Sequence, residues 1–147
     1  MWSWISIISL FVPIRGKLYP NMIITDQYKY CHVTFYQFPN SEIFEKLVEI
    51  FAHDSHVKLG QIDLSTEYSK SRIFQNVAGF DEFGGSIVIF EKRAKNRKCL
   101  SNLPTPMPKG ILVKSTKLAD IVETVNSICH AFRKVDGKLT MAGLHKE

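Results

Sequence analysis

The stretch that decides the fold class runs from Tyr30 to Leu64 and reads YCHVTFYQFPNSEIFEKLVEIFAHDSHVKLGQIDL. Its first eight residues carry aromatic and β-branched side chains and alternate in the manner of a strand. The tripeptide FPN breaks this strand, and Ser41 then offers an N-cap for an amphipathic helix over Glu42–His53. Val57–Leu64 is a second stretch with strand periodicity. The order strand, helix, strand predicts a βαβ crossover.

The rest of the chain adds further elements of both kinds. Ser65–Phe74 predicts a short helix, and the three glycines within Gly79–Gly85 predict a turn. Ser86–Glu91 (SIVIFE) is a continuous apolar run, which is typical of a central strand covered on both faces. Gly110–Lys114 predicts another strand, and Thr116–Phe132 predicts a closing helix that its first residue caps. The chain is therefore expected to be α/β, with a mixed central sheet flanked by helices.

These elements also define an expected core. Because successive strand residues point to opposite faces, Ile87 and Ile89 face one side of the sheet and Val88 the other. The last helix carries an apolar stripe that would pack across the sheet on the isoleucine side. The residues expected to be buried together are Ile87, Ile89, Ile121, Val125 and Phe132.

Length and composition argue against a two-domain enzyme, a solenoid and a multi-span membrane protein. The 147 residues, 45% of them hydrophobic, suffice for one packed domain, and no repeat is visible. A net charge of +5 is mildly basic and does not by itself imply nucleic acid. Cys31, Cys99 and Cys129 form no C-x-x-C pair, which leaves no zinc site and no dithiol redox centre. No P-loop, G-x-G-x-x-G or G-x-S-x-G motif occurs, so no cofactor is expected.

The N-terminal run Met1–Ile14 (MWSWISIISLFVPI) carries no charge. A membrane span needs about 20 apolar residues, so this run predicts no span. The apolar region of a secretory signal needs only about 7 to 15 residues, and we expect a signal peptide over 1–16 with cleavage after Gly16. The alternatives are an apolar first strand or buried arm, a membrane anchor, or an artefact of the gene model. Cleavage would place the chain in an oxidising compartment where its thiols could pair.

Four short stretches resemble the thioredoxin-like domains of protein disulfide isomerases. Val33–Gln37 is similar to the V-E-F-Y-A strand that leads into their active site, and Phe44–Leu47 to part of the following helix. Val57–Asp63 is similar to their V-x-L-A-K-V-D strand, and Gly84–Phe90 to their Y-P-T-L-x-x-F strand. The resemblance covers residues 28–132 and implies a thioredoxin-like domain, which we expect over 22–133.

The chain departs from that family at its active site. The family continues its strand with W-C-x-x-C-K, whereas Gln37 is followed here by FPNS. The family's proline opposite the dithiol falls near Gly85, where no proline stands. Dithiol exchange needs an accessible thiolate and a resolving partner. The resemblance therefore implies a redox-inactive binding or chaperone-like module of the secretory pathway, in the endoplasmic reticulum lumen or secreted.

The C-terminal residues 134–147 are expected to be a polar tail. Together with Val125-Asn126 and Phe132-Arg133, they are also similar to the start of a helical domain that follows the last thioredoxin domain in some disulfide isomerases. Too few residues are present for such a domain to fold.

Two surfaces are candidates for binding. Polypeptide partners are expected where the thioredoxin fold usually meets substrates, near the FPN break and the glycine turn. The basic turn between two predicted strands could bind phosphate, an acidic peptide or nucleic acid, or could be a solvated hairpin turn or a localisation signal. Its aromatic neighbours are not interleaved with the charges, so nucleic acid is not expected. The partner surface consists of Phe38, Pro39, Phe80, Phe83 and Gly85, and the basic turn of Lys92, Arg93, Lys95, Arg97 and Lys98.

The histidines give no metal site. His53 and His56 lie at the end of the predicted helix, where they would interact with its dipole, and too few ligands accompany them. His32 and Cys31 are strand neighbours and point to opposite faces, which excludes a catalytic pair. Asp63 is expected to cap the end of a strand.

Enzymatic activity is not expected, but two alternatives to a binding module stay open. One is a thioredoxin-fold enzyme with a single reactive cysteine at Cys31 or Cys99. The other is a basic cytosolic or nuclear interaction protein, in which the N-terminal apolar run is structural.

Overall fold

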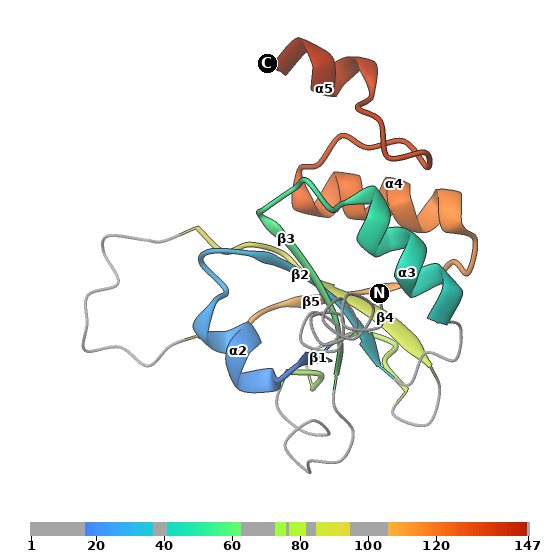
Figure 1. Ribbon diagram of the computed structural model, residues 1–147. Helices are drawn as coiled ribbons and strands as arrows, with labels where there is room; N and C mark the ends of the chain where they lie inside the picture. The colour runs from blue at the N-terminus through green and yellow to red at the C-terminus, as the bar shows by residue number, and fades with distance from the viewer. Residues whose placement is uncertain are drawn as a thin grey trace, which may run out of the picture.

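The computed structural model describes residues 17–36, 41–62, 73–75, 77–81, 85–94 and 106–146. A five-stranded sheet with the strand order β1-β3-β2-β4-β5 lies between helices (Figure 1). The predicted α/β class, with a mixed sheet flanked by helices, is confirmed. The strands are β1 (Lys17–Leu18), β2 (Cys31–Tyr36), β3 (Val57–Ile62), β4 (Ser86–Phe90) and β5 (Gly110–Val113). The helices are α2 (Pro20–Thr25), α3 (Ser41–Ile50), α4 (Leu118–Cys129) and α5 (Met141–Lys146).

Strand β2 occupies the centre of the sheet. It runs parallel to β3 and antiparallel to β4, so Val33 lies between Leu59 on one side and Ile89 on the other. All six β2 residues are buried, as their aromatic and β-branched composition predicts. Strands β1 and β3 are parallel, whereas β4 and β5 form an antiparallel pair. The parallel half of the sheet thus follows from the βαβ crossover through α3.

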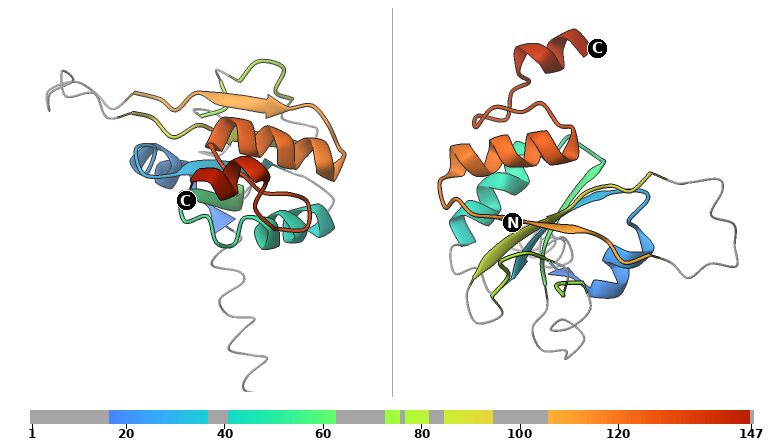
Figure 2. Two further views of the ribbon diagram at one scale, coloured as in Figure 1. Left: turned by 90° about the horizontal axis from the view of Figure 1, so that it is seen from above. Right: turned by 180° about the vertical axis from the view of Figure 1, so that it is seen from behind.

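Helices α3 and α4 cover one face of the sheet and α2 the other, as the two views in Figure 2 show. The core under α3 and α4 contains Ile87, Ile89, Ile121 and Val125, which confirms four of the five residues expected to be buried together. Phe132 was expected there and is absent from that cluster. It lies three residues beyond the end of α4, after His130 has turned the chain with a left-handed φ of 55°.

The second face of the sheet has its own core, under α2. Val88 belongs to it, which confirms the predicted alternation along β4. Its buried members are Leu18, Ile23, Tyr36, Ile62, Ile73, Phe74, Val77, Val88 and Phe90.

Both predicted termini of each long helix are wrong, and α4 ends at Cys129 rather than at Phe132. Helix α3 ends at Ile50 rather than at His53, and Ser41 is its first residue rather than its cap. The cap of α4 is Lys117, with no capping bond from its side chain, and not Thr116. Ser115 takes over part of that role, because its hydroxyl accepts a hydrogen bond from the Lys117 backbone N–H at 3.2 Å.

Three elements escaped prediction because each is too short to show a period. These are β1, α2 and α5, of two, six and six residues. Pro20 at the start of α2 is the one local signal, since proline favours the first helical position. Helix α5 lies within 134–147, the stretch expected to be a polar tail.

The predicted signal peptide over 1–16 lies outside the described residues. So does the predicted helix over Ser65–Phe74, except for its last two residues. No helix within the described ranges is long and apolar enough to cross a membrane.

Candidate functional site

A disulfide joins Cys31, the first residue of β2, to Cys129, the last residue of α4. The two residues are 98 positions apart in sequence, their Cα atoms are 5.5 Å apart, and both are buried. Neither sulfur is therefore a free thiol, which contradicts the alternative of a reactive Cys31. Cys99 lies outside the described residues. No spacing in the sequence could have identified this pair, because disulfide connectivity cannot be deduced from sequence alone.

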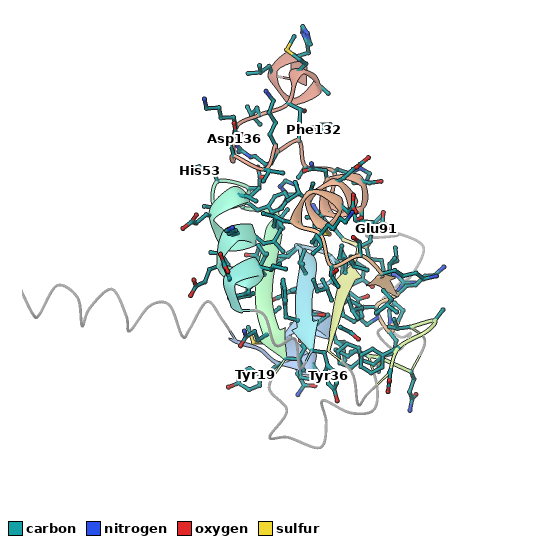
Figure 3. The ribbon with its side chains drawn as sticks, turned by 90° about the vertical axis from the view of Figure 1, so that its right-hand side faces the viewer. Tyr19, Tyr36, His53, Glu91, Phe132 and Asp136 are labelled. Carbon is teal, nitrogen blue, oxygen red and sulfur yellow. A yellow bond between two sulfur atoms is a disulfide. The ribbon has the colours of Figure 1, made fainter. Side chains whose placement is uncertain are left out.

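The disulfide lies at the opposite end of β2 from the place where the family resemblance would put a dithiol. Five residue steps along β2 separate Cys31 from Tyr36, a distance of about 17 Å at the rise of a strand. In Figure 3 Tyr36 lies at one end of the sheet, and His53 and Phe132 lie at the other. The sulfur atoms are thus remote from the start of α3 at Ser41.

Two residues of the expected partner surface are described, Phe80 and Gly85. Gly85 is exposed and directly precedes β4, at the Tyr36 end of the sheet. Phe80 is half-buried and packs against the core under α2. Phe38, Pro39 and Phe83 lie outside the described residues.

Phe80 belongs to an aromatic cluster at this end of the sheet. Its ring centroid lies 4.5 Å from that of Phe74, in a stacked arrangement, and 5.0 Å from that of Tyr36. Phe74 also contacts Phe90 at a centroid distance of 6.1 Å. Such pairs contribute about 0.5 to 1.5 kcal/mol beyond their area burial. Phe80 therefore holds residues 77–81 against the sheet, and Gly85 is the exposed member of the surface.

His32 is a buried polar residue that the sequence did not single out as unusual. It is fully buried on the α2 side of β2, and among the described residues neither ring nitrogen has a hydrogen-bond partner. Burial, together with the charge of Lys58 and against an opposing effect of Asp26, lowers the pKa of His32 from 6.5 to about 4. The imidazole is thus neutral at physiological pH and packs edge-on to the Tyr30 ring, 6.0 Å between centroids.

Of the two histidines expected at the end of the first long helix, His56 contacts a different helix. The ring of His56 donates from Nε2 to the carbonyl oxygen of Cys129 at 3.0 Å, so it caps the C-terminus of α4 rather than α3. His53 lies three residues past the end of α3. Among the residues that the structure describes, no three His, Cys, Asp or Glu side chains are grouped closely enough to hold a metal ion.

Residues 131–146 are fastened to the domain by polar contacts that the sequence did not predict. The Arg133 guanidinium donates to both carboxylate oxygens of Asp54 at 3.0 and 3.1 Å, and each side chain is only 13% exposed. Asn126 on α4 bonds the Arg133 backbone at both N–H and carbonyl. The stretch then turns at Gly137 and enters α5, whose Met141 and Leu144 are exposed.

Two residues of the predicted basic turn, Lys92 and Arg93, are described, and both are exposed. Arg93 donates from its backbone to the Gln27 carbonyl at 2.7 Å and from its side chain to the Met107 carbonyl at 3.1 Å. Lys95, Arg97 and Lys98 lie outside the described residues, as does Asp63. The segment after β4 is thus anchored at Arg93.

Comparison with known proteins does not identify a family for this chain. No protein-family model matches the chain, and neither a curated protein nor a solved structure does.

Proposed function

We propose that this chain is a redox-inactive, thioredoxin-like domain of the secretory pathway that binds polypeptide partners, in the endoplasmic reticulum lumen or after secretion. The strand order β1-β3-β2-β4-β5 and the antiparallel β4–β5 pair are compatible with that fold. The described residues of the four stretches with family resemblance fall on β2, α3, β3 and β4, with Gly85 directly before β4. These positions support the proposed fold.

The Cys31–Cys129 disulfide is the observation that carries the proposal. Disulfides form and persist in secreted proteins and in the lumen of the endoplasmic reticulum, and they are rare in the cytosol and nucleus. A buried disulfide joining the central strand to a core helix is a structural element rather than a redox centre. It favours the secretory pathway over the cytosolic or nuclear alternative.

The absence of a C-x-x-C pair supports the redox-inactive part of the proposal. We expect that the purified domain does not accelerate the reduction of insulin disulfides by a thiol reductant. The rate should equal that of the reductant alone. Cys99→Ser provides the control for the one cysteine outside the disulfide. Turnover above the reductant alone that disappears in Cys99→Ser would identify a single-cysteine enzyme instead.

The binding part of the proposal places the polypeptide at the Gly85 end of the sheet. The probe is fluorescently labelled α-lactalbumin, kept unfolded by reduction and carboxymethylation, and binding is read by anisotropy. We expect Gly85→Asp to weaken binding about tenfold, because a charge would be desolvated in an apolar contact.

Ser127→Asp is the matched control, since Ser127 is an exposed residue on α4 and receives the same charge. It should bind the unfolded probe like the unmodified domain. Equal loss in both variants, or no binding by the unmodified domain, would refute this binding surface.

A further inference from the structure

The sheet opens into a cleft where β4 ends and β5 begins. The last paired residues of the two strands are Phe90 and Gly110. Beyond them the ladder stops, since Pro108 has no backbone N–H to donate. A cleft of about 430 Å³ lies between residues 91–94 and the segment with Pro108 and Lys109 that leads into β5. In Figure 1 the two segments leave the sheet toward the same side of the molecule and diverge, with the turn after α2 between them.

Gln27 is hydrogen-bonded to both segments that form the walls of the cleft. Its carbonyl accepts the Arg93 backbone N–H at 2.7 Å, from the segment after β4. Its side-chain amide donates to the Pro106 carbonyl at 2.9 Å, from the segment before β5. Gln27 is 2% exposed, and its Oε1 has no hydrogen-bond partner among the residues that the structure describes. Because one buried residue is hydrogen-bonded to both segments, the cleft belongs to the folded domain and is not an accidental gap between two loops.

The rim of the cleft carries a surplus of positive charge. Lys92, Arg93 and Lys109 are all exposed residues of its lining. Glu91 is the only acidic residue in the described part of the lining, and its carboxylate lies 3.9 Å from the His130 ring. This imbalance favours an anionic occupant.

An exposed apolar side chain beside these cations favours a polypeptide among anionic occupants. Ile111 on β5 is 39% exposed and lines the cleft. An acidic polypeptide can present carboxylates to the cations and apolar side chains to Ile111, whereas an inorganic anion can make only the first contact. None of the lining residues that the structure describes is aromatic, so a nucleic-acid base would find no ring to stack on among them.

We infer that this cleft docks an extended acidic polypeptide segment, whose carboxylates contact Lys92, Arg93 and Lys109 and whose apolar side chains contact Ile111. The cleft lies at the C-terminal end of β4, whereas Gly85 lies before its N-terminal end. The inference is therefore independent of the binding surface proposed above.

The test uses a fluorescein-labelled peptide of alternating Glu and Val residues, with anisotropy measured at low salt. We expect the unmodified protein to bind, and Lys92→Glu/Lys109→Glu to bind at least about tenfold more weakly. The matched control is Lys134→Glu/Lys138→Glu, which makes the same charge change at two exposed residues outside the cleft. This control should retain the affinity within about threefold.

Competition separates the peptide from other anions. Inorganic phosphate, a short oligothymidylate and unlabelled peptide are each added as competitors, and their concentrations are counted per negative charge. Phosphate and oligothymidylate should displace the labelled peptide only at concentrations about tenfold or more above that of the unlabelled peptide. Three results would overturn the inference. They are no binding by the unmodified protein, equal losses in the two double variants, and displacement by oligothymidylate as effective as by peptide.

Discussion

His32 occupies the central strand, and neither of its ring nitrogens is hydrogen-bonded to any residue that the structure describes. A neutral imidazole tolerates this position better than a charged one, so burial holds its pKa near 4. The unfolded chain binds a proton at His32 below pH 6.5, whereas the folded chain does so only near pH 4. Between these values the unfolded state holds more protons, and stability therefore falls as the pH falls.

His32→Leu should remove this pH dependence. The protein loses about 3 kcal/mol through His32 between pH 6.5 and 4, at about 1.4 kcal/mol for each pKa unit. The leucine variant should lose less over the same range and should be at least as stable at pH 7, since it buries no unpaired polar group. Urea melts of both proteins at pH 7 and pH 4 measure the difference. Equal losses on acidification would show that His32 is not a buried neutral base.

Single residues also show what the sequence could reveal. The alternation of strand side chains correctly separated Val88 from Ile87 and Ile89, and Cys31 from His32. It could not reveal that the described residues offer His32 no hydrogen-bond partner, because its surroundings depend on elements far away in sequence. Gly85 and Phe80 were grouped as one surface, but packing on Tyr36 and Phe74 separates their roles.

Strands β4 and β5 illustrate how burial differs across one ladder. Ile89 on β4 is paired directly with Ile111 on β5. Ile89 is completely buried between β2 and β5, whereas Ile111 lies on the edge and is partly exposed. Two identical side chains in register thus have very different surroundings.

This pair provides a matched test of the element placement. Ile89→Ala should lower the free energy of unfolding by about 2 to 5 kcal/mol, the usual cost of truncating a buried isoleucine. Ile111→Ala should lower it by less than about 1 kcal/mol. Denaturant melts give both values. A loss for Ile111→Ala that equals or exceeds the loss for Ile89→Ala would mean that β4 and β5 are misplaced.

Long periodic elements were predictable and short ones were not. Strands β2 and β3 and helices α3 and α4 show clear periods, β4 and β5 correspond to short apolar runs, and the existence of all six follows from the sequence. The start of α4 was misjudged because no side-chain hydrogen bond from its N-cap marks it, and its end because His130 turns the chain in a left-handed conformation. Helix α5 is ordered within a stretch whose composition reads as a polar tail.

The C-terminal part of the chain is held to the sheet at several points near one end of the molecule. The disulfide joins α4 to β2, His56 donates to the last carbonyl of α4, and Arg133 pairs with Asp54. Each of these contacts links residues more than 70 positions apart in sequence. Such contacts depend on the complete fold, which is why local patterns did not reveal them.

Removing the disulfide should weaken the whole domain. A closed loop of about 100 residues stabilises the folded state by about 4 to 5 kcal/mol in the chain-entropy model. Cys31→Ala/Cys129→Ala should therefore lose much of a total stability of about 5 to 15 kcal/mol. Cys99→Ala is the control and should melt near the unmodified protein. Equal midpoints for the double variant and the unmodified protein would mean that the disulfide contributes nothing.

The oxidation state of the cysteines in cells tests the secretory, redox-inactive assignment most directly. Free thiols are alkylated before lysis, and tryptic fragments of the purified protein are analysed by mass spectrometry without reduction. We predict that fragment 30–46, which contains Cys31, and fragment 118–133, which contains Cys129, are recovered linked to one another. Recovery of both fragments as separate, alkylated peptides would contradict the disulfide and the compartment inferred from it.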